Sequence, residues 1–561
     1  MAVTVSAASQ QPIENGAGLW LRLLTMWHAV VGLAGLAGVW AVWQVFPPET
    51  PPWQRILLSI ILLLTALASA WAIPLIMRRQ HRGRMISLVV NYLWFLICFF
   101  GALHVLGVFT GLNALANTFG RGIPFLLVGF VGYLVSAFGD RYENKPAQQR
   151  LFQRIGQIIM AVAGVIFLFA VDTLSGVLAI LSRYNSPLPF ALTIGAVLFG
   201  VMIWAMWRKT SAEAMGANNA HEETLSGYLF LSPNLLGFLI FFAGPLLFSL
   251  YISFTNSDAV RPAEWVGLQN YAKVLNIRVA QLASPDQPFE QVMNVKVYDE
   301  LGRFGVLGQN IVIGAEDKLF WISLRNTFLF VLLAVPLSVI PALFLANLLN
   351  SKLPGMKLYR AIYFIPSIAA VVGIALIWQL LFNATIGYIN YGITVVITSI
   401  NDLLGTAIAD PQIRWLSDSK TALLSLVIIV VWQTMGFNTV LFTAGLQNIP
   451  KDLYEAAMVD GSGRWTTFWK ITLPMLAPTT FFVVTTTTIQ AMQVFDHVFI
   501  LINPPAGPNN STLTMVLYLY QKGFQRFEQG YAAAIAWVLF IIIFGVTLVQ
   551  FQRQRASAYD S

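Results

Sequence analysis

Charged residues are scarce in this chain. They make up 10% of its 561 residues, against about 25% in an ordinary globular protein. Apolar residues make up 57%, and the mean hydropathy is +0.69. Such a chain is not a disordered protein, a coiled coil or an ordinary soluble enzyme. Because a membrane helix needs about 20 apolar residues, the composition predicts an all-α integral membrane protein with about a dozen spans.

Cysteine and histidine are also too few to build a reactive site. Cys98 is the single cysteine, which excludes a disulfide within the chain and a cysteine-based metal site. The five histidines are scattered, with no pair at ligand spacing. No GxxxxGK[ST] segment occurs, so the chain does not cradle a nucleotide by that route. We therefore expect no catalytic residues, no metal site and no resident cofactor.

Apolar runs of 18 or more residues divide the chain into two halves. The early half has six predicted spans, at 20–46, 55–77, 85–109, 122–139, 155–182 and 188–207. The late half has another six, at 225–255, 322–350, 360–383, 421–447, 474–502 and 530–551. The run at 386–400 is shorter and contains two glycines, so we predict an external or interfacial piece there.

Lysine and arginine indicate the orientation, because they resist translocation. With both termini in the cytoplasm, eighteen of them fall in inside loops and seven in short outside loops. The net charge of +8 then mostly reflects the basic residues that keep the inside loops in the cytoplasm. The expected partner of the chain is therefore a lipid bilayer and not a nucleic acid. The first 19 residues lack Lys and Arg, so we expect no cleaved signal peptide.

Two longer segments separate the spans. The segment 210–224 consists mainly of small and polar residues. We interpret it as a cytoplasmic linker that follows an N-terminal transmembrane region at 1–209. The longest outside stretch, 256–320, alternates apolar and polar residues at Val295–Tyr298 and Gly305–Gly314. Alternation is typical of strands, so we predict a small β-containing insertion at about 276–318.

One inside loop, at about 448–474, is more than a connector. Pro450 suits the first turn of a helix, and Asp452 and Glu455 suit its N-terminal end. Gly461 and Gly463 then break the helix. The pattern predicts a short amphipathic helix and a glycine turn on the cytoplasmic face. It fits a helix lying on lipid and a helix docked on another protein equally well.

This loop resembles the signature loop of bacterial ABC importer permeases, in which Glu-Ala-Ala, three residues, Gly and nine residues precede Ile-x-Leu-Pro. By the resemblance, the ATPase-coupling residues are Glu455, Ala456, Ala457, Asp460, Gly461, Ile471, Leu473 and Pro474. The resemblance covers about residues 225–555, and this part of the chain is similar to sugar permeases of the maltose and glycerol-3-phosphate type. It is carried by YLFLSPNLLGFLIFFAGPLLFSLYISFT (228–255), YRAIYFIP (359–366) and FEQGYAAA (527–534), among other segments.

The resemblance implies a six-span type I ABC importer permease core at 225–555, preceded by six extra spans of unknown role. It also implies an ABC ATPase dimer, a second homologous permease and an extracytoplasmic solute-binding protein as partners. ATP would then be hydrolysed on a separate subunit, so this chain is not expected to be an enzyme. The expected place is the bacterial inner membrane, and the expected solute is a sugar or related polyol.

Polar residues within the late spans indicate a solute pathway. Thr486, Gln490, Gln493 and His497 recur at helical spacing, with Asp496 beside them. The predicted pathway residues are Gln490, Gln493, Asp496, Gln433 and Asn438. Amides can donate and accept, which suits a neutral, hydroxyl-rich solute. Hydrogen bonding between helices is the alternative role for each of these residues.

A twelve-helix secondary carrier driven by an ion gradient is the competing function. Twelve spans arranged six and six are common in such carriers, and the segment RRQHRGR at 78–84 is basic, as in the major facilitator group. The Gly and Asp-Arg that usually precede those basic residues are missing, and a carrier leaves the 448–474 loop unexplained. The importer permease therefore explains more of the sequence.

Overall fold

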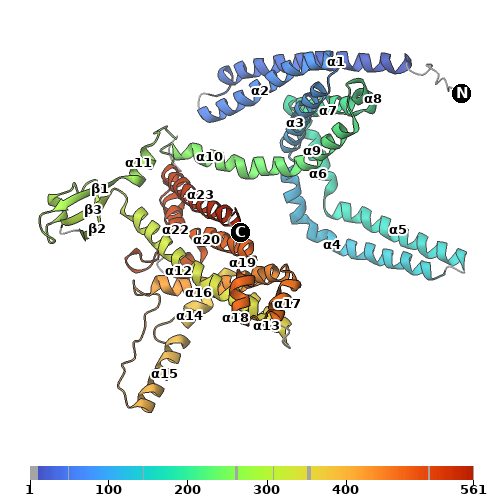
Figure 1. Ribbon diagram of the computed structural model, residues 1–561. Helices are drawn as coiled ribbons and strands as arrows, with labels where there is room; N and C mark the ends of the chain where they lie inside the picture. The colour runs from blue at the N-terminus through green and yellow to red at the C-terminus, as the bar shows by residue number, and fades with distance from the viewer. Residues whose placement is uncertain are drawn as a thin grey trace. The chain divides into compact units, whose positions relative to one another are not determined.

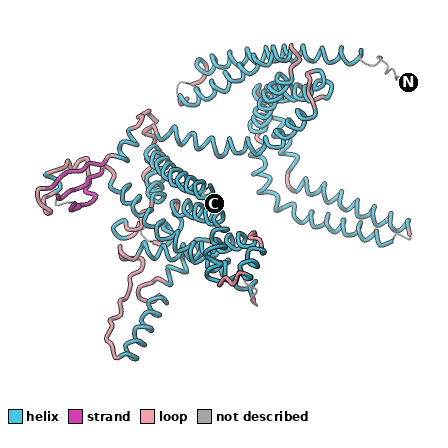
Figure 2. The backbone as a smooth tube through the Cα atoms, in the orientation of Figure 1, coloured by secondary structure: helices cyan, strands magenta, loops and turns pink. Residues whose placement is uncertain are grey.

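The computed structural model describes residues 11–47, 50–142, 145–258, 263–306, 309–349, 355–502 and 506–559. The chain forms two compact units, Met1–Leu235 and Leu236–Ser561, and each is considered by itself. Figure 1 shows the helices of both units and a small sheet in the second. Figure 2 shows that helix dominates the described chain.

The first unit consists of helical hairpins. Its helices are α1 (Gln11–Gln44), α2 (Pro52–Met77), α3 (His81–Val105), α4 (Val108–Gly139), α5 (Pro146–Ala170), α6 (Thr173–Ser182), α7 (Pro187–Trp207), α8 (Lys209–Ala214) and most of α9 (Asn219–Phe238), with short turns η1 (Asp140–Tyr142) and η2 (Arg183–Asn185). α1 packs on α2, α4 on α5, and α3 on α7. Most of their apolar side chains stay exposed, as membrane helices require.

The second unit begins within a long helix and ends in another. Before the sheet lie η3 (Leu239–Ala243), α10 (Gly244–Ser253) and α11 (Gln269–Leu275). The sheet consists of β1 (Ile277–Leu282), β2 (Asp299–Val306) and β3 (Gln309–Ala315), and the short turn η4 (Phe289–Gln291) lies between β1 and β2. After it come α12 (Lys318–Leu349), α13 (Met356–Ile368), α14 (Val371–Leu381), α15 (Tyr388–Leu404), α16 (Ala422–Gln447), α17 (Lys451–Val459), α18 (Arg464–Thr467), η5 (Phe468–Thr472), α19 (Leu473–Met475), α20 (Ala477–Met492), α21 (Asp496–Leu501), η6 (Pro508–Asn510), α22 (Met515–Tyr520), η7 (Gln521–Gln525) and α23 (Gln529–Tyr559).

The core of the second unit lies where α12, α16 and α20 pack together. Phe330, Leu426 and Val483, one from each helix, are fully buried there. Within the described residues, ten helices are long and apolar enough to cross a membrane, and two bent helix pairs bring the number to twelve if each pair is one span. The predicted helical membrane fold with about twelve spans is confirmed.

Three predicted spans are wrong as single helices. The span 155–182 is divided between α5 and α6 by Asp172, whose backbone is left-handed with φ of 63°. The span 360–383 is divided between α13 and α14, which meet at 98°. The span 474–502 is broken at both ends. Pro478 has no N–H to donate to the Pro474 carbonyl, and the chain bends by 68° before α20 begins.

The predicted β-containing insertion is confirmed as an antiparallel sheet with strand order β1-β3-β2. The segment Gly305–Gly314 takes in the end of β2 and most of β3, except for residues 307 and 308, which lie outside the described residues. The segment Val295–Tyr298 is a turn and not a strand. On β2, Arg303 donates from Nε and Nη2 to the two oxygens of Glu300, which lowers the pKa of that carboxyl.

The boundary between the two compact units lies inside α9. α8 and the start of α9 make most of the segment 210–224 helical. Arg84 explains why α9 begins with the first unit. Its side chain is 0% exposed, forms an ion pair with Glu222 of α9, and donates from Nε to the Met206 carbonyl at 2.9 Å. The predicted domain boundaries stay a prediction.

Candidate functional site

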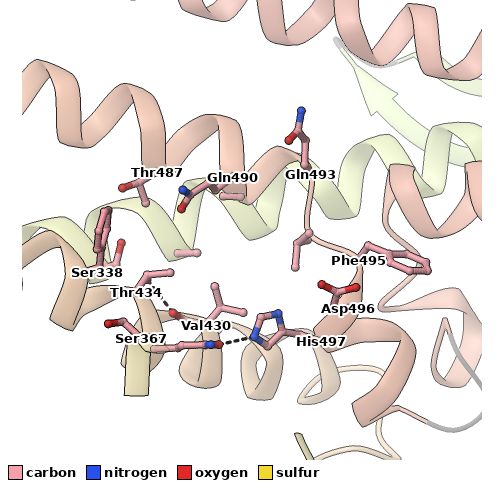
Figure 3. Close-up of a pocket in the computed structure, with 15 residues that line it drawn as sticks. Ser338, Ser367, Val430, Thr434, Thr487, Gln490, Gln493, Phe495, Asp496 and His497 are labelled. Carbon is pink, nitrogen blue, oxygen red and sulfur yellow. Dashed lines mark hydrogen bonds between the residues drawn. The ribbon is translucent and has the colours of Figure 1, made fainter. Parts of the chain in front are cut away.

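A cavity of about 410 Å³ with several polar lining residues lies in the second unit, among α12, α13, α16, α20 and α21. We call it the central cavity. Its polar lining residues are Ser338, Ser367, Gln433, Thr434, Thr487, Gln490, Gln493, Asp496 and His497. In Figure 3, Gln490 and Thr487 lie on one side of it, and Thr434, Ser367 and His497 lie on the other. Five elements thus bring hydroxyl, amide, imidazole and carboxylate groups to one space.

Hydrogen bonds orient much of this lining. His497 Nε2 and Gln433 Oε1 are 2.6 Å apart, which fixes a buried amide against the ring. The hydroxyl groups of Ser338, Ser367 and Thr434 each donate to a carbonyl in their own helix, at 2.7 to 3.1 Å. Because each hydroxyl hydrogen is used in this way, the oxygen lone pairs remain as acceptors. The cavity wall therefore offers acceptors to a solute that carries hydroxyl groups.

Four of the five predicted pathway residues line this cavity. Gln490, Gln493 and Asp496 are exposed there, and Gln433 is buried in the wall. Asn438 does not line it. Asn438 is 3% exposed, and its Oδ1 accepts a 3.3 Å hydrogen bond from Thr487. This is the interhelical role that the sequence left open for each of these residues.

The single helical face predicted for these residues is wrong. α20 ends at Met492, and α21 begins at Asp496, so His497 reaches the cavity from a different helix. Thr486 shares the predicted spacing but does not line the cavity. In Figure 3 the amide of Gln493 points away from the other labelled polar groups, because the backbone turns at this residue. Ser338 and Ser367 were missed, since one small hydroxyl in an apolar helix gives no spacing signal.

The second candidate element is the loop at 448–474, where the predicted short helix is confirmed. α17 follows Pro450 and ends before Asp460. Gly461 has φ of 69°, a conformation that costs other residues strain. Its N–H donates to the Met458 carbonyl at 3.1 Å, and the Ser462 N–H donates to the Ala457 carbonyl at 2.9 Å. These two bonds form a Schellman motif, so Gly461 is the residue that ends the helix.

One side of the loop packs on the core, and the other is open. Tyr454 and Thr472 are joined by a hydroxyl–hydroxyl hydrogen bond of 3.2 Å. Phe468 is buried and stacks on Phe344 of α12, with ring centroids 5.7 Å apart. Val459, at 87% exposed, is the most open apolar residue of α17. A helix held at its base with an open apolar end is suited to contact a further surface.

The predicted coupling residues are divided between these two sides. The exposed ones are Glu455, Ala456, Asp460, Gly461 and Pro474. Ala457 is buried against the rest of the unit, while Ile471 and Leu473 are half-buried in η5 and α19. The spacing of the motif thus places its first part on an open helix and its last part at the anchored base.

Comparison with known proteins identifies the family. A family model described as "Binding-protein-dependent transport system inner membrane component" matches residues 325–557. The probable ABC transporter permease protein YesP of Bacillus subtilis (strain 168) is 34% identical over 343 residues, which cover 61% of this chain and 94% of YesP. The chain belongs to this family of binding-protein-dependent transport permeases.

Two further similarities involve transporters named for their cargo. The lactose transport system permease protein LacF of Rhizobium radiobacter is 34% identical to this permease over 248 residues, covering 44% of this chain and 80% of LacF. The crystal structure of a bacterial ABC transporter that imports the acidic polysaccharide alginate has 18% sequence identity and a TM-score of 0.44. That match covers 60% of this chain and 96% of the other.

The predicted membership of the ABC importer permeases is therefore confirmed. The protein is a multi-pass membrane permease, the transport component of a binding-protein-dependent ABC importer. A secondary carrier driven by an ion gradient does not belong to this family, so the competing function is set aside. The roles of individual residues in the loop and in the central cavity stay predictions.

Proposed function

We propose that this permease imports a sugar or related polyol through the central cavity. The lining supports this solute class, because serine and threonine oxygens and glutamine amides can bond to hydroxyl groups. Among the described residues that line the cavity, Asp496 and His497 are the ionisable ones, and none is an arginine or lysine that would favour an anionic solute. The lactose permease LacF is a relative with a named sugar.

The exposed end of α17 supports coupling to an ABC ATPase dimer on a separate subunit. In this proposal Glu455, Ala456 and Asp460 face the ATPase, and the permease itself does not hydrolyse ATP. The open apolar end at Val459 would be covered by the ATPase, while Phe468 and Phe344 transmit its movement to α12. The Schellman turn at Gly461 carries this proposal, because it holds the helix end rigid for a partner.

The remaining assembly follows from the same function. We propose a second homologous permease beside this chain and an extracytoplasmic solute-binding protein that delivers the solute. Both termini would be cytoplasmic, in the inner membrane of a bacterial cell, as the distribution of Lys and Arg indicates. The insertion formed by β1, β2 and β3 would then lie outside, where the binding protein docks.

Substitutions in the loop test the coupling proposal. Gly461→Pro cannot adopt a positive φ and removes the N–H that donates to Met458, so it destroys the turn. Glu455→Lys reverses an exposed charge. We expect both to abolish solute-stimulated ATP hydrolysis by the complete transporter in proteoliposomes, while the permease stays in the membrane.

Gly463→Ala is the matched control for this test. Gly463 has φ of −71°, and no neighbouring atom would touch an added Cβ, so this substitution should retain activity. Normal stimulated hydrolysis in both Gly461→Pro and Glu455→Lys would contradict the coupling role of the loop.

A further inference from the structure

A second cavity lies at the end of the core that leads into the loop at 448–474, which we call the coupling loop, and α17 within it is the coupling helix. Its volume is about 210 Å³, roughly half that of the central cavity. Leu349 ends α12, and Gln447 ends α16 three residues before Pro450, the residue that precedes α17. We call this cavity the inner pocket. Gln447 thus joins the wall of this pocket to α17 through the three residues 448–450.

The same two helices line both cavities. On α13, Ser367 lines the central cavity, while Arg360 and Tyr363 line the inner pocket. The spacing of these three residues places them on one face of the helix. α16 likewise contributes Gln433 to the first and Thr443 to the second. The two cavities are therefore successive spaces along one pair of helices, and not unrelated surface hollows.

A close helix crossing lies between them. A Cβ added to Gly436 of α16 would overlap the backbone carbonyl of Tyr363 on α13. The absence of a side chain at Gly436 thus lets the two backbones touch at this level. Gly436 and Tyr363 line the inner pocket, and the next residue, Phe437, lines the central cavity, so this close contact lies where the linings of the two cavities adjoin.

The wall of the inner pocket is mostly apolar, with a few polar groups that can bond to hydroxyl groups of a ligand. The Thr439 hydroxyl donates to the Met435 carbonyl and the Thr443 hydroxyl to the Thr439 carbonyl, both at 2.7 Å, so both oxygens remain acceptors. Across the pocket, Arg360 Nη2 donates to the Leu349 carbonyl at 3.0 Å, which holds the guanidinium in the wall. Its other N–H groups are donors of a kind that sugar hydroxyls accept.

We propose that the inner pocket is a second binding subsite for the transported solute, occupied after the solute leaves the central cavity. The proposal rests on the proposed sugar-import function and adds a site to it. Solute in the inner pocket contacts α16 close to the coupling helix, so release from it is linked to the movement of that helix.

Cysteine protection tests this site. With Cys98→Ser as background, the chain has no cysteine, so a single one can be placed at will. Ala444→Cys reports on the inner pocket, which Ala444 lines with an exposed side chain, and Thr434→Cys reports on the central cavity. Ala456→Cys on the exposed face of α17 is the control. Each variant is purified in the complete transporter, and maleimide labelling of this chain is timed with and without lactose.

Lactose bound in a cavity should protect the cysteine placed there from maleimide. At a lactose concentration about twice the dissociation constant, labelling should slow about threefold, because the free fraction falls by 1 + [L]/Kd. We expect this slowing at Ala444→Cys and Thr434→Cys and not at Ala456→Cys. Slowing at Thr434→Cys alone would overturn the inner subsite and leave the proposed function intact. Slowing at neither position would overturn the inner pocket as a subsite for lactose and would also contradict lactose as the solute.

Discussion

At the scale of single residues, the polar groups of the second unit are of two kinds. Gln433 and Asn438 are buried, and the amide oxygen of each is already hydrogen-bonded to another side chain of the protein. Gln490, Gln493 and Asp496 are exposed to the central cavity. Only groups of the second kind are free to exchange water for a solute.

The double substitution Gln493→Ala and Asp496→Ala should therefore weaken solute binding. Each lost hydrogen bond is worth about 0.5 to 1.5 kcal/mol, so the concentration for half-maximal uptake should rise about tenfold. Radiolabelled sugar uptake in vesicles measures this rise. Thr486→Val, which does not line the cavity, is the control and should leave uptake unchanged. Equal behaviour of the two variants would remove Gln493 and Asp496 from the pathway.

At the scale of elements, a buried carboxylate joins the end of the insertion to the core. Asp317 lies between β3 and α12, and only 8% of it is exposed. Its carboxylate accepts hydrogen bonds from the hydroxyl groups of Tyr518 and Tyr531 and from the Phe320 N–H. One side chain thus connects the start of α12 to α22 and α23.

Asp317→Ala should destabilise this junction. It leaves two tyrosine hydroxyls in a buried site without their acceptor, at a cost of about 1 to 3 kcal/mol each. Thermal unfolding of the purified complex, followed by size-exclusion chromatography after heating, should show loss at a lower temperature. Asp286→Ala, at an exposed position in the same insertion, is the control. If both variants unfold at the wild-type temperature, the junction does not stabilise the fold.

At the scale of the whole molecule, the family likeness covers one part of the chain. The match to YesP covers 61% of the chain, and the family model begins at residue 325. The coupling loop and both cavities lie in the unit Leu236–Ser561. The first unit thus holds none of the residues assigned to transport in the described structure.

A chain that starts at α9, residues 219–561, should therefore still bind the ATPase. The cut removes Arg84 from Glu222, but Glu222 has 41% of its side chain exposed, so water can solvate the freed carboxylate. Co-purification of a tagged 219–561 chain with the ATPase, compared with the full chain, measures the outcome. Loss of the ATPase from a chain that is still inserted would show that the first unit takes part in assembly.

The amount that could be predicted from sequence differs between the two candidate sites. The coupling loop was predictable because its structure is local. Pro450, Glu455 and Gly461 are close in the chain, and each acts on the backbone within one or two turns. The central cavity was only partly predictable. Its lining depends on the break after Met492, which periodicity through residue 497 does not reveal.

The sequence alone therefore determined the membrane fold, the family and the position of the coupling helix, because composition, apolar run length and local backbone preferences act along the chain. The tertiary structure decided which polar residues share a space. Ser338 and Ser367 meet Gln490 only because α12, α13 and α20 pack around α16, and Asn438 is bonded to Thr487 without lining the cavity itself. Such contacts depend on bends and crossings between distant helices, which no local pattern encodes.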